Sequence, residues 1–308
     1  PIRKLMPYAN SARRAGKRII HLNIGQPDID SPAVSLKVLK EDKRTVIEYS
    51  PSEGYESYRE HLSAYYRRGG VDVNTEDIII TTGGSEALVF GMMSCMDPGD
   101  EVIIPEPFYA NYNSFAQMAG LKIMPVTAVI EDGFSLPKIA DFEAVITSKT
   151  KAILICNPGN PTGKVYAPEE LDALAQLSLK HDLFLFSDEV YREFCYGDEV
   201  PGSVMNYGDL EQNAIMIDSV SKRFSMCGAR VGALVTKNSE VRAAVMKFAM
   251  ARLSPPTLGQ IASEAALLAP ESYFEDVRNR YVARRDLLVK GLNEIPGVLC
   301  PKPGGAFY

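Results

Sequence analysis

The sequence is poor in the residues that build metal sites and disulfide frameworks. Its three histidines, His21, His61 and His181, are scattered and lack metal-ligand spacing, so we expect no metal. The five cysteines are odd in number, widely spaced and without a Cys-x-x-Cys pair. This pattern argues against a zinc site or a disulfide framework and favours a reducing compartment.

Charge and hydropathy exclude further classes of protein. The net charge is -6 and there is no long basic run, so nucleic acid is not an expected partner. The chain starts without an apolar signal core, and no apolar run reaches transmembrane length. No Gly-x-Ser-x-Gly elbow occurs. We therefore expect a cytoplasmic enzyme with no membrane partner.

The sequence does contain strand and helix patterns in alternation. Apolar runs predict seven strands, at 78–82, 101–104, 122–126, 151–156, 183–186, 214–217 and 231–235. Helical patterns lie between and after them, among them 55–68, 87–96, 168–181, 239–252 and 272–293. This order predicts an α/β fold, a three-layer α/β/α arrangement around a mostly parallel seven-stranded sheet. The length of 308 residues favours a second, smaller domain.

A lysine follows one of the predicted strands. The run 214–217 reads as buried, so Lys222 lies just beyond the end of a strand, where open α/β sheets bind ligands. A lysine amine that burial or a nearby cation deprotonates is a nucleophile toward carbonyl groups and can form a Schiff base. Arg230 is a permanent cation whose planar fork suits a phosphate. On this spacing alone, an ordinary surface lysine is an equally good interpretation.

Two other strand ends carry polar residues. The Gly83-Gly84 turn opens a helix, where it either binds an anion or is simply capped by Ser85. Asp188 ends an apolar strand, where a carboxylate is costly unless it is paired. Tyr191, three residues further on, is expected on the same side as Asp188, with Glu189 pointing elsewhere.

A glycine-containing loop follows the strand at 151–156. It reads Asn-Pro-Gly-Asn-Pro-Thr-Gly over 157–163. This is not a phosphate-binding P-loop, because Gly159 and Gly163 are one residue too close and Val165 stands where Ser or Thr is needed.

Taken together, these motifs resemble class I/II aminotransferases, the pyridoxal-phosphate-dependent enzymes of fold type I, and in particular aspartate aminotransferases. The resemblance is carried by Ser-x-Ser-Lys-x-Phe-Ser-x-x-Gly-x-Arg-x-Gly at 219–232, by the 157–163 loop, by the Asp188 and Gly83-Gly84 motifs, and by Gly-x-Pro-Asp at 25–28. The motifs occur in family order and span nearly the whole chain. The implied cofactor is pyridoxal 5'-phosphate.

The resemblance implies a role for each site residue. Lys222 would hold the cofactor as a Schiff base and move the substrate proton, Asp188 would keep the pyridine nitrogen protonated, and Tyr191 would donate to the ring oxygen O3′. The implied cofactor contacts are Gly84, Ser85, Glu86, Tyr109, Asn160, Asp188, Tyr191, Ser219, Lys222 and Arg230, with Tyr49 reaching across from the partner subunit of a homodimer. Gly25 and Asn160 would contact the substrate. Phe108 and the tyrosines of 55–68 are expected in the core.

The implied activity is transfer of the amino group of an L-amino acid to a 2-oxo acid by a ping-pong mechanism. Two alternatives stay open: a β-lyase or decarboxylase on the same fold, and a non-catalytic pyridoxal-phosphate-binding module. The lack of a helix-turn-helix pattern at the N-terminus counts against a regulator of the second kind. A structural protein without cofactor would be colourless when purified.

The resemblance also predicts the domains and a missing part. The large cofactor-binding domain is expected at 42–285, and the small domain at 1–41 and 286–308. Family members continue beyond a segment like 304–308, and their continuation supplies the arginine that binds the substrate α-carboxylate, so we assign no residue to that role and expect a truncated small domain. The donor amino acid is not predicted. Arg252 is expected to face solvent.

Overall fold

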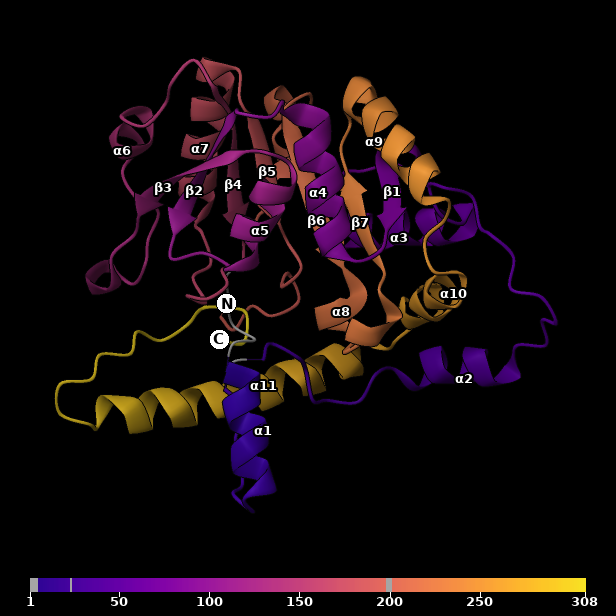
Figure 1. The fold of residues 1–308 in the computed structure, drawn as a ribbon, viewed down its shortest axis with the longest axis horizontal. Helices are drawn as coiled ribbons and strands as arrows, with labels where there is room; N and C mark the ends of the chain where they lie inside the picture. The colour runs from indigo at the N-terminus through magenta and orange to yellow at the C-terminus, as the bar shows by residue number, and fades with distance from the viewer. Residues whose placement is uncertain (1–4, 23, 198–200) are drawn as a thin grey trace.

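The computed structural model describes residues 5–22, 24–197 and 201–308. Its centre is a seven-stranded sheet of order β1-β7-β6-β5-β4-β2-β3 (Figure 1). Strand β7 is antiparallel to both of its neighbours, and the other neighbouring strands run parallel. The strands are β1 (Ile78–Thr81), β2 (Glu101–Glu106), β3 (Lys122–Thr127), β4 (Thr150–Cys156), β5 (Phe184–Asp188), β6 (Ala214–Ser219) and β7 (Gly232–Val235).

Helices precede, separate and follow these strands. The α-helices are α1 (Met6–Arg14), α2 (Ala33–Glu41), α3 (Glu56–Arg68), α4 (Gly84–Cys95), α5 (Asn111–Met118), α6 (Ile139–Glu143), α7 (Pro168–His181), α8 (Val220–Arg223), α9 (Ser239–Arg252), α10 (Thr257–Ala266) and α11 (Glu271–Asn293). Short 3-10 helices are η2 (Thr75–Asp77), η3 (Ile130–Asp132), η4 (Val204–Asn206), η5 (Gly208–Leu210) and η6 (Cys227–Ala229).

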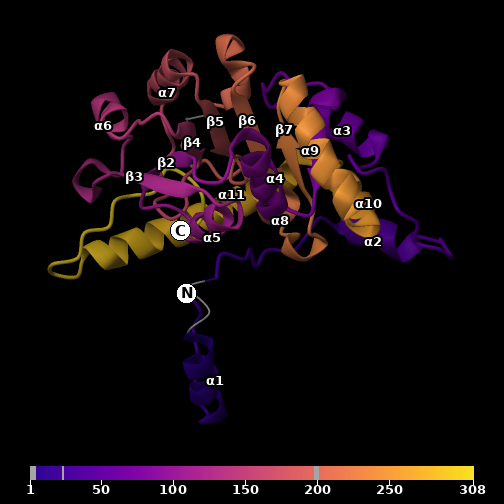
Figure 2. The ribbon, with the colours of Figure 1, turned by 45° about the horizontal axis from the view of Figure 1, so that its top comes forward.

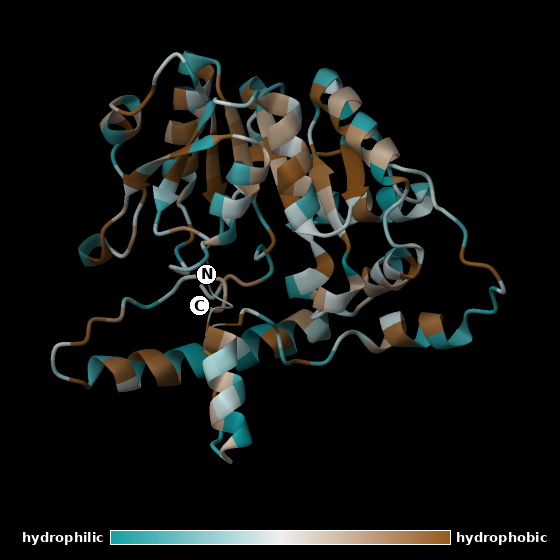
Figure 3. Ribbon diagram, viewed as in Figure 1, coloured by the Kyte–Doolittle hydropathy of each residue, from teal (hydrophilic) through white to brown (hydrophobic). Residues whose placement is uncertain are grey.

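The two faces of the sheet bury two separate cores. Successive side chains of a strand point to opposite faces. Accordingly Ile79 packs with α4, α5 and α9, whereas Ile78 and Ile80 pack with α3, α7 and α10. The strands form the brown centre of Figure 3, with helices of mixed hydropathy around them. The predicted three-layer α/β/α fold is confirmed.

Helix α7 shows how local sequence sets the bounds of an element. Pro168 occupies the first turn, where its missing N–H group is not needed. The carboxylate of Glu170 accepts a hydrogen bond from the Ala167 N–H at 2.7 Å, which satisfies a donor at the start of the helix. Asp182 ends the helix in the left-handed conformation. The helix therefore occupies the predicted residues 168–181.

Helix α11 lies below the sheet and crosses beneath it, and α1 projects away from the rest of the molecule (Figures 1 and 2). Helix α11 runs without a break through residue 285. The domain boundaries predicted at 42 and 285 stay a prediction. Within the described ranges no helix is long and apolar enough to cross a membrane.

Candidate active site

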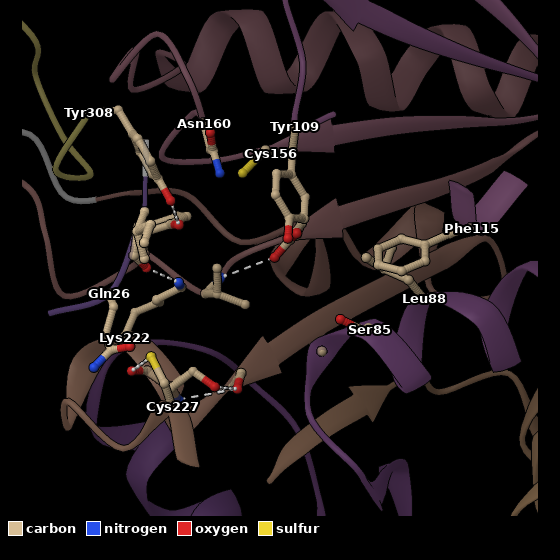
Figure 4. Close-up of a pocket in the computed structure, with 18 of the residues that line it drawn as sticks. Gln26, Ser85, Leu88, Tyr109, Phe115, Cys156, Asn160, Lys222, Cys227 and Tyr308 are labelled. Atoms are coloured by element: carbon tan, nitrogen blue, oxygen red, sulfur yellow. Dashed lines mark hydrogen bonds between the residues drawn. The ribbon is translucent and has the colours of Figure 1, made fainter. Parts of the chain in front are cut away.

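A cavity of about 520 Å³ opens at the carboxyl ends of β4, β5 and β6. Figure 4 shows Tyr109, Asn160 and Tyr308 on one side of it, with Lys222 reaching in from α8. Most of the predicted site residues meet here: the lining includes Gly25, Gly84, Ser85, Tyr109, Asn160, Asp188, Tyr191, Ser219, Lys222 and Arg230.

Lys222 is held on the short helix α8. Ser219 caps this helix, because its hydroxyl oxygen accepts a hydrogen bond from the Ser221 N–H at 3.2 Å. The Lys222 Nζ donates to the Gly25 carbonyl at 2.5 Å. Burial lowers the pKa of Lys222 below its usual value; the Arg230 charge lowers it further, whereas the facing Cys227, Asp188 and Cys156 oppose the shift. A lysine in this setting deprotonates more readily and becomes a nucleophile.

Asp188 ends β5 inside the molecule and is 6% exposed. Burial raises its pKa to about 6, although two hydrogen bonds favour the charged form. The Tyr112 hydroxyl donates to Oδ2 at 2.8 Å, and the Val190 N–H lies 3.4 Å from Oδ1. No cation in the described chain forms a salt bridge with this carboxylate, so its charge is available to a positive group in the cavity.

Tyr112 is a residue that the sequence analysis missed. It lies one helical turn beyond Tyr109, and the two rings meet edge to face with centroids 5.4 Å apart. Tyr112 is completely buried, so a tyrosine in that helical pattern reads as core. Its only sequence signal is the spacing of three from Tyr109. Phe108 packs against the core, as expected.

Tyr191 completes the inner wall. Its hydroxyl lies 2.9 Å from the Tyr308 hydroxyl, and the Phe307 ring packs edge to face on its ring at 5.3 Å. Glu189 is turned away from the cavity, as its spacing predicts, and lies 3.4 Å from Arg192. Asn160 also lines the cavity, and in Figure 4 it lies between Tyr308 and Tyr109.

The far end of the cavity suits an anion. Gly83 is the N-cap of α4, with φ at 78°, so the first turn of that helix opens toward the cavity at Gly84 and Ser85. Arg230 approaches so closely that a Cβ on Gly83 would lie 2.6 Å from Nη2. A helix N-terminus beside a guanidinium is favourable for a phosphate.

Three side chains are placed differently from the rest. Glu86 does not line the cavity: it accepts from the Thr82 N–H at 2.7 Å and pairs with Arg252 at 3.3 Å. Arg252 was expected to face solvent, and this is wrong, because its side chain is 14% exposed and also donates to the Ser52 carbonyl at 2.8 Å. Tyr49 is 77% exposed and lies outside the lining of this chain's own cavity.

The residues present fit pyridoxal phosphate. A half-buried amine suits its aldehyde, a buried carboxylate without a salt-bridge partner among the described residues suits its ring nitrogen, and Asn160 and Tyr191 offer donors for its ring oxygen. The helix end beside Arg230 suits its phosphate. Among the described residues no cluster of three or more His, Cys, Asp or Glu side chains could hold a metal ion.

Comparison with known proteins assigns the family. The model of aminotransferase class I and II matches residues 17–308. The aspartate/prephenate aminotransferase of Thermus thermophilus is 34% identical over 307 residues, which cover 96% of this chain and 77% of that protein. The aspartate aminotransferase of Bacillus subtilis is 32% identical over 303 residues, which cover 97% of this chain and 77% of that protein.

Solved structures support the same family assignment. A double mutant of Thermus thermophilus aspartate aminotransferase superposes with a TM-score of 0.91 at 33% identity, covering 98% of this chain and 79% of that one. Alanine aminotransferase from Pyrococcus furiosus superposes with a TM-score of 0.92 at 32% identity, covering 99% of this chain and 79% of that one. The chain therefore belongs to the class I and II aminotransferase family. Like that family it uses pyridoxal phosphate, and the reaction it catalyses is amino-group transfer to a 2-oxo acid rather than lyase or decarboxylase chemistry.

Proposed function

We propose that Lys222 and Asp188, which line one cavity, carry the amino transfer. The observation that carries the proposal is that a half-buried amine with a lowered pKa and a buried carboxylate without a salt-bridge partner line the same cavity. When bound, pyridoxal phosphate supplies an electron sink for the electrons of a bond at the substrate Cα. The protein's part is to place groups around that sink.

Lys222 has two tasks in this proposal. Its Nζ would hold the aldehyde carbon of pyridoxal phosphate, with loss of water, and would be free again when a substrate amino group takes its place. The freed amine then takes the proton from the substrate Cα and returns it as an acid. The Gly25 carbonyl, which accepts from Nζ at 2.5 Å, keeps the amine beside the substrate side of the cavity. The same residues act in reverse on the 2-oxo acid, which is the ping-pong order.

The other lining residues orient the ring and hold its charge. Asp188 keeps the ring nitrogen protonated, because a buried carboxylate stabilises a cation placed against it. Asn160 and Tyr191 would offer hydrogen-bond donors to the ring oxygen, and Tyr109 would offer an aromatic face to the ring. Gly84, Ser85, Ser219 and Arg230 would hold the phosphate. Glu86 would contribute indirectly, because its carboxylate accepts from the Thr82 N–H beside the start of α4.

A second copy of the chain is the proposed partner. Tyr49 lies in the segment between α2 and α3, part of which extends away from the body in Figure 1, and its neighbour Glu48 accepts a hydrogen bond from the Thr257 hydroxyl at 2.8 Å. Some exposed apolar side chains lie close to Tyr49 in the sequence, and others lie at the end of α9. An exposed apolar surface of this kind favours association. These side chains are Val46, Ile47, Met250 and Leu253, each more than half exposed. In a homodimer, Tyr49 would reach the cofactor phosphate of the other subunit.

The donor amino acid is proposed from relatives. Aspartate is named for the Thermus and Bacillus proteins, and alanine for the Pyrococcus protein. We propose aspartate as the donor, and a comparison of aspartate, alanine and phenylalanine with one 2-oxo acid acceptor tests it. A higher kcat/KM for alanine or phenylalanine would contradict this donor. The cytoplasmic location stays a prediction.

Single-turnover kinetics test the roles of the two central residues. Asp188→Ala should slow proton removal from the substrate Cα by a larger factor than it weakens cofactor binding. Equal losses in the two quantities would contradict its assigned role. Assays of pyruvate and ammonia release in the same reactions separate transfer from β-elimination.

A further inference from the structure

A network of buried charges lies directly behind the cavity. It consists of Glu189, Arg192, Asp218, Arg223 and Tyr66, and is called the back network below. None of these five side chains lines the cavity. Each charged member is the chain neighbour of a lining residue: Glu189 of Asp188, Arg192 of Tyr191, Asp218 of Ser219, and Arg223 of Lys222.

One half of the back network holds the end of β6 and the helix α8. The Tyr66 hydroxyl donates to Asp218 Oδ2 at 2.5 Å, and the same carboxylate pairs with Arg223. The other oxygen, Oδ1, accepts from the Ser219 N–H at 2.7 Å. A single carboxylate therefore ties α3 to the backbone that begins α8 and to the residue next to Lys222.

The other half holds the segment after β5. The Arg192 guanidinium lies 5.2 Å from the centre of the Tyr66 ring, and its Nη2 lies 3.4 Å from Glu189 Oε2. Glu189 also accepts from the Ser203 hydroxyl at 3.0 Å and from the Val204 N–H at 3.2 Å. Tyr66 is therefore the member that contacts both halves, through its ring on the β5 side and its hydroxyl on the β6 side.

Because the members of the back network are buried, the loss of one contact between them destabilises the others. Glu189, Asp218 and Tyr66 are each 1% exposed, and Arg223 is 2% exposed. Among the described residues, Nε and Nη1 of Arg223 have no hydrogen-bond partner. Its guanidinium is stabilised by Asp218 and by the rings of Tyr65 and Phe224, at 4.9 and 5.7 Å. Removing one partner of a buried charge leaves the other uncompensated, and the structure around it must then shift.

We propose that Tyr66 is a positioning residue, which fixes the separation of Lys222 and Asp188 from behind through the back network. This inference rests on the proposed roles of those two residues. Tyr66 touches neither substrate nor cofactor. It acts because Asp188 ends β5 and Lys222 follows β6 on α8, and a buried residue after the first strand end, Arg192, and one at the second, Asp218, both contact this tyrosine.

The test uses the cofactor-free full chain and a Tyr66→Phe variant. This substitution keeps the ring against Arg192 and removes only the hydroxyl bound to Asp218. The measurement is reductive methylation of the Lys222 Nζ across pH, followed on its peptide by mass spectrometry. The pH of half-maximal labelling reports the pKa of that amine without any cofactor turnover.

The direction of the shift follows from the groups that face Lys222. Cys156, Asp188, Cys227 and Arg230 face it, and Asp188 is the carboxylate among them. A looser strand end lets the amine and this carboxylate separate, which weakens their attraction and favours the neutral amine. We expect the labelling midpoint to fall by about half a pH unit or more. In the loaded enzyme we expect kcat to fall about fivefold with little change in KM.

Tyr58→Phe is the matched control. Tyr58 belongs to the same helix and the same core, is also 1% exposed, and has its hydroxyl bonded to Ser263 rather than to Asp218. It should lower the thermal midpoint about as much as Tyr66→Phe and leave the labelling midpoint of Lys222 in place. In an Asp188→Asn background, Tyr66→Phe should no longer shift that midpoint.

The outcomes distinguish a failure of the positioning role of Tyr66 from a failure of the proposed function. An unshifted midpoint in Tyr66→Phe, an equal shift in Tyr58→Phe, or a shift that survives in the Asp188→Asn background would overturn the positioning role. Labelling of wild-type Lys222 at the midpoint of ordinary surface lysines would instead contradict the proposed function, because its amine would then not be poised as a nucleophile.

Discussion

The Tyr112 hydroxyl donates a 2.8 Å hydrogen bond to Asp188 across 76 residues of sequence. Both groups are buried, and the bond favours the charged form of the carboxylate. Tyr112→Phe should therefore raise the pKa of Asp188 above its value of about 6 and move the acidic limb of the kcat/KM profile to higher pH. A pH profile that matches wild type would contradict this link; Phe108→Tyr, which leaves the bond intact, is the control.

The same carboxylate predicts an effect on stability in the cofactor-free protein. Its folded pKa of about 6 lies above the usual 3.8, so the charged form is disfavoured in the fold. Its contribution to the free energy of unfolding is present below pH 3.8 and is lost as pH rises through about 6. Asp188→Asn should be more stable than wild type by about 3 kcal/mol at pH 7, with the difference vanishing near pH 4.

Urea titrations of both cofactor-free proteins at the two pH values measure this difference. Asp72→Asn, on an exposed side chain, is the control and should leave the pH dependence nearly unchanged. A wild-type protein that gains stability between pH 4 and 7 relative to Asp188→Asn would contradict the burial argument.

Gly25 has no room for a side chain. A Cβ there would lie 1.8 Å from the Tyr308 hydroxyl, so Gly25→Ala must displace the ring and disturb the 2.9 Å contact of Tyr308 with Tyr191. We expect kcat/KM to fall about tenfold or more, as small misplacements in a site do. Steady-state kinetics measure it, with Gly208→Ala, where a Cβ meets nothing within 4 Å, as the control. If the clash is the cause, adding Tyr308→Ala to Gly25→Ala should recover part of the binding of substrate.

Gly232 supports the proposed phosphate site from the side. A Cβ at this position would lie 2.5 Å from the Gly83 carbonyl carbon and 2.6 Å from the Gly84 nitrogen, and backbone atoms cannot swing aside. Gly232→Ala should push the start of α4 outward and weaken cofactor binding about tenfold or more. Equilibrium binding of pyridoxal phosphate measures it. Equal affinity of Gly232→Ala and Gly228→Ala, which meets nothing within 4 Å, would contradict the packing argument.

Much of the fold follows from local signals. The seven predicted strands are present because apolar runs that end in Gly, Pro or polar residues mark buried strands. Helix α7 matches its prediction because Pro168 and Asp182 mark its ends. Lys222 and Asp188 could be predicted as site residues because Asp188 ends such a strand and Lys222 follows another, and the carboxyl ends of parallel strands meet at one edge.

Contacts between distant segments could not be predicted. Nothing near Tyr112 in the sequence points to Asp188, and the pairing depends on how α5 packs against the sheet. Glu86 reads as part of an anion-binding turn, yet its carboxylate accepts from the Thr82 N–H and pairs with the cation Arg252, which local spacing does not reveal. Arg223 looks like a surface residue by type, and only the fold shows that Asp218 receives it in the interior.

The central claim is that the Lys222 amine holds the cofactor. Borohydride reduction of the loaded protein, followed by digestion and mass spectrometry, tests it most directly. We predict one added pyridoxyl-phosphate mass on the peptide that contains Lys222, and a Lys222→Ala variant with neither this adduct, nor the reducible visible absorbance, nor amino transfer. An adduct on a different lysine, or a Lys222→Ala variant that keeps the reducible absorbance and the transfer, would contradict the account.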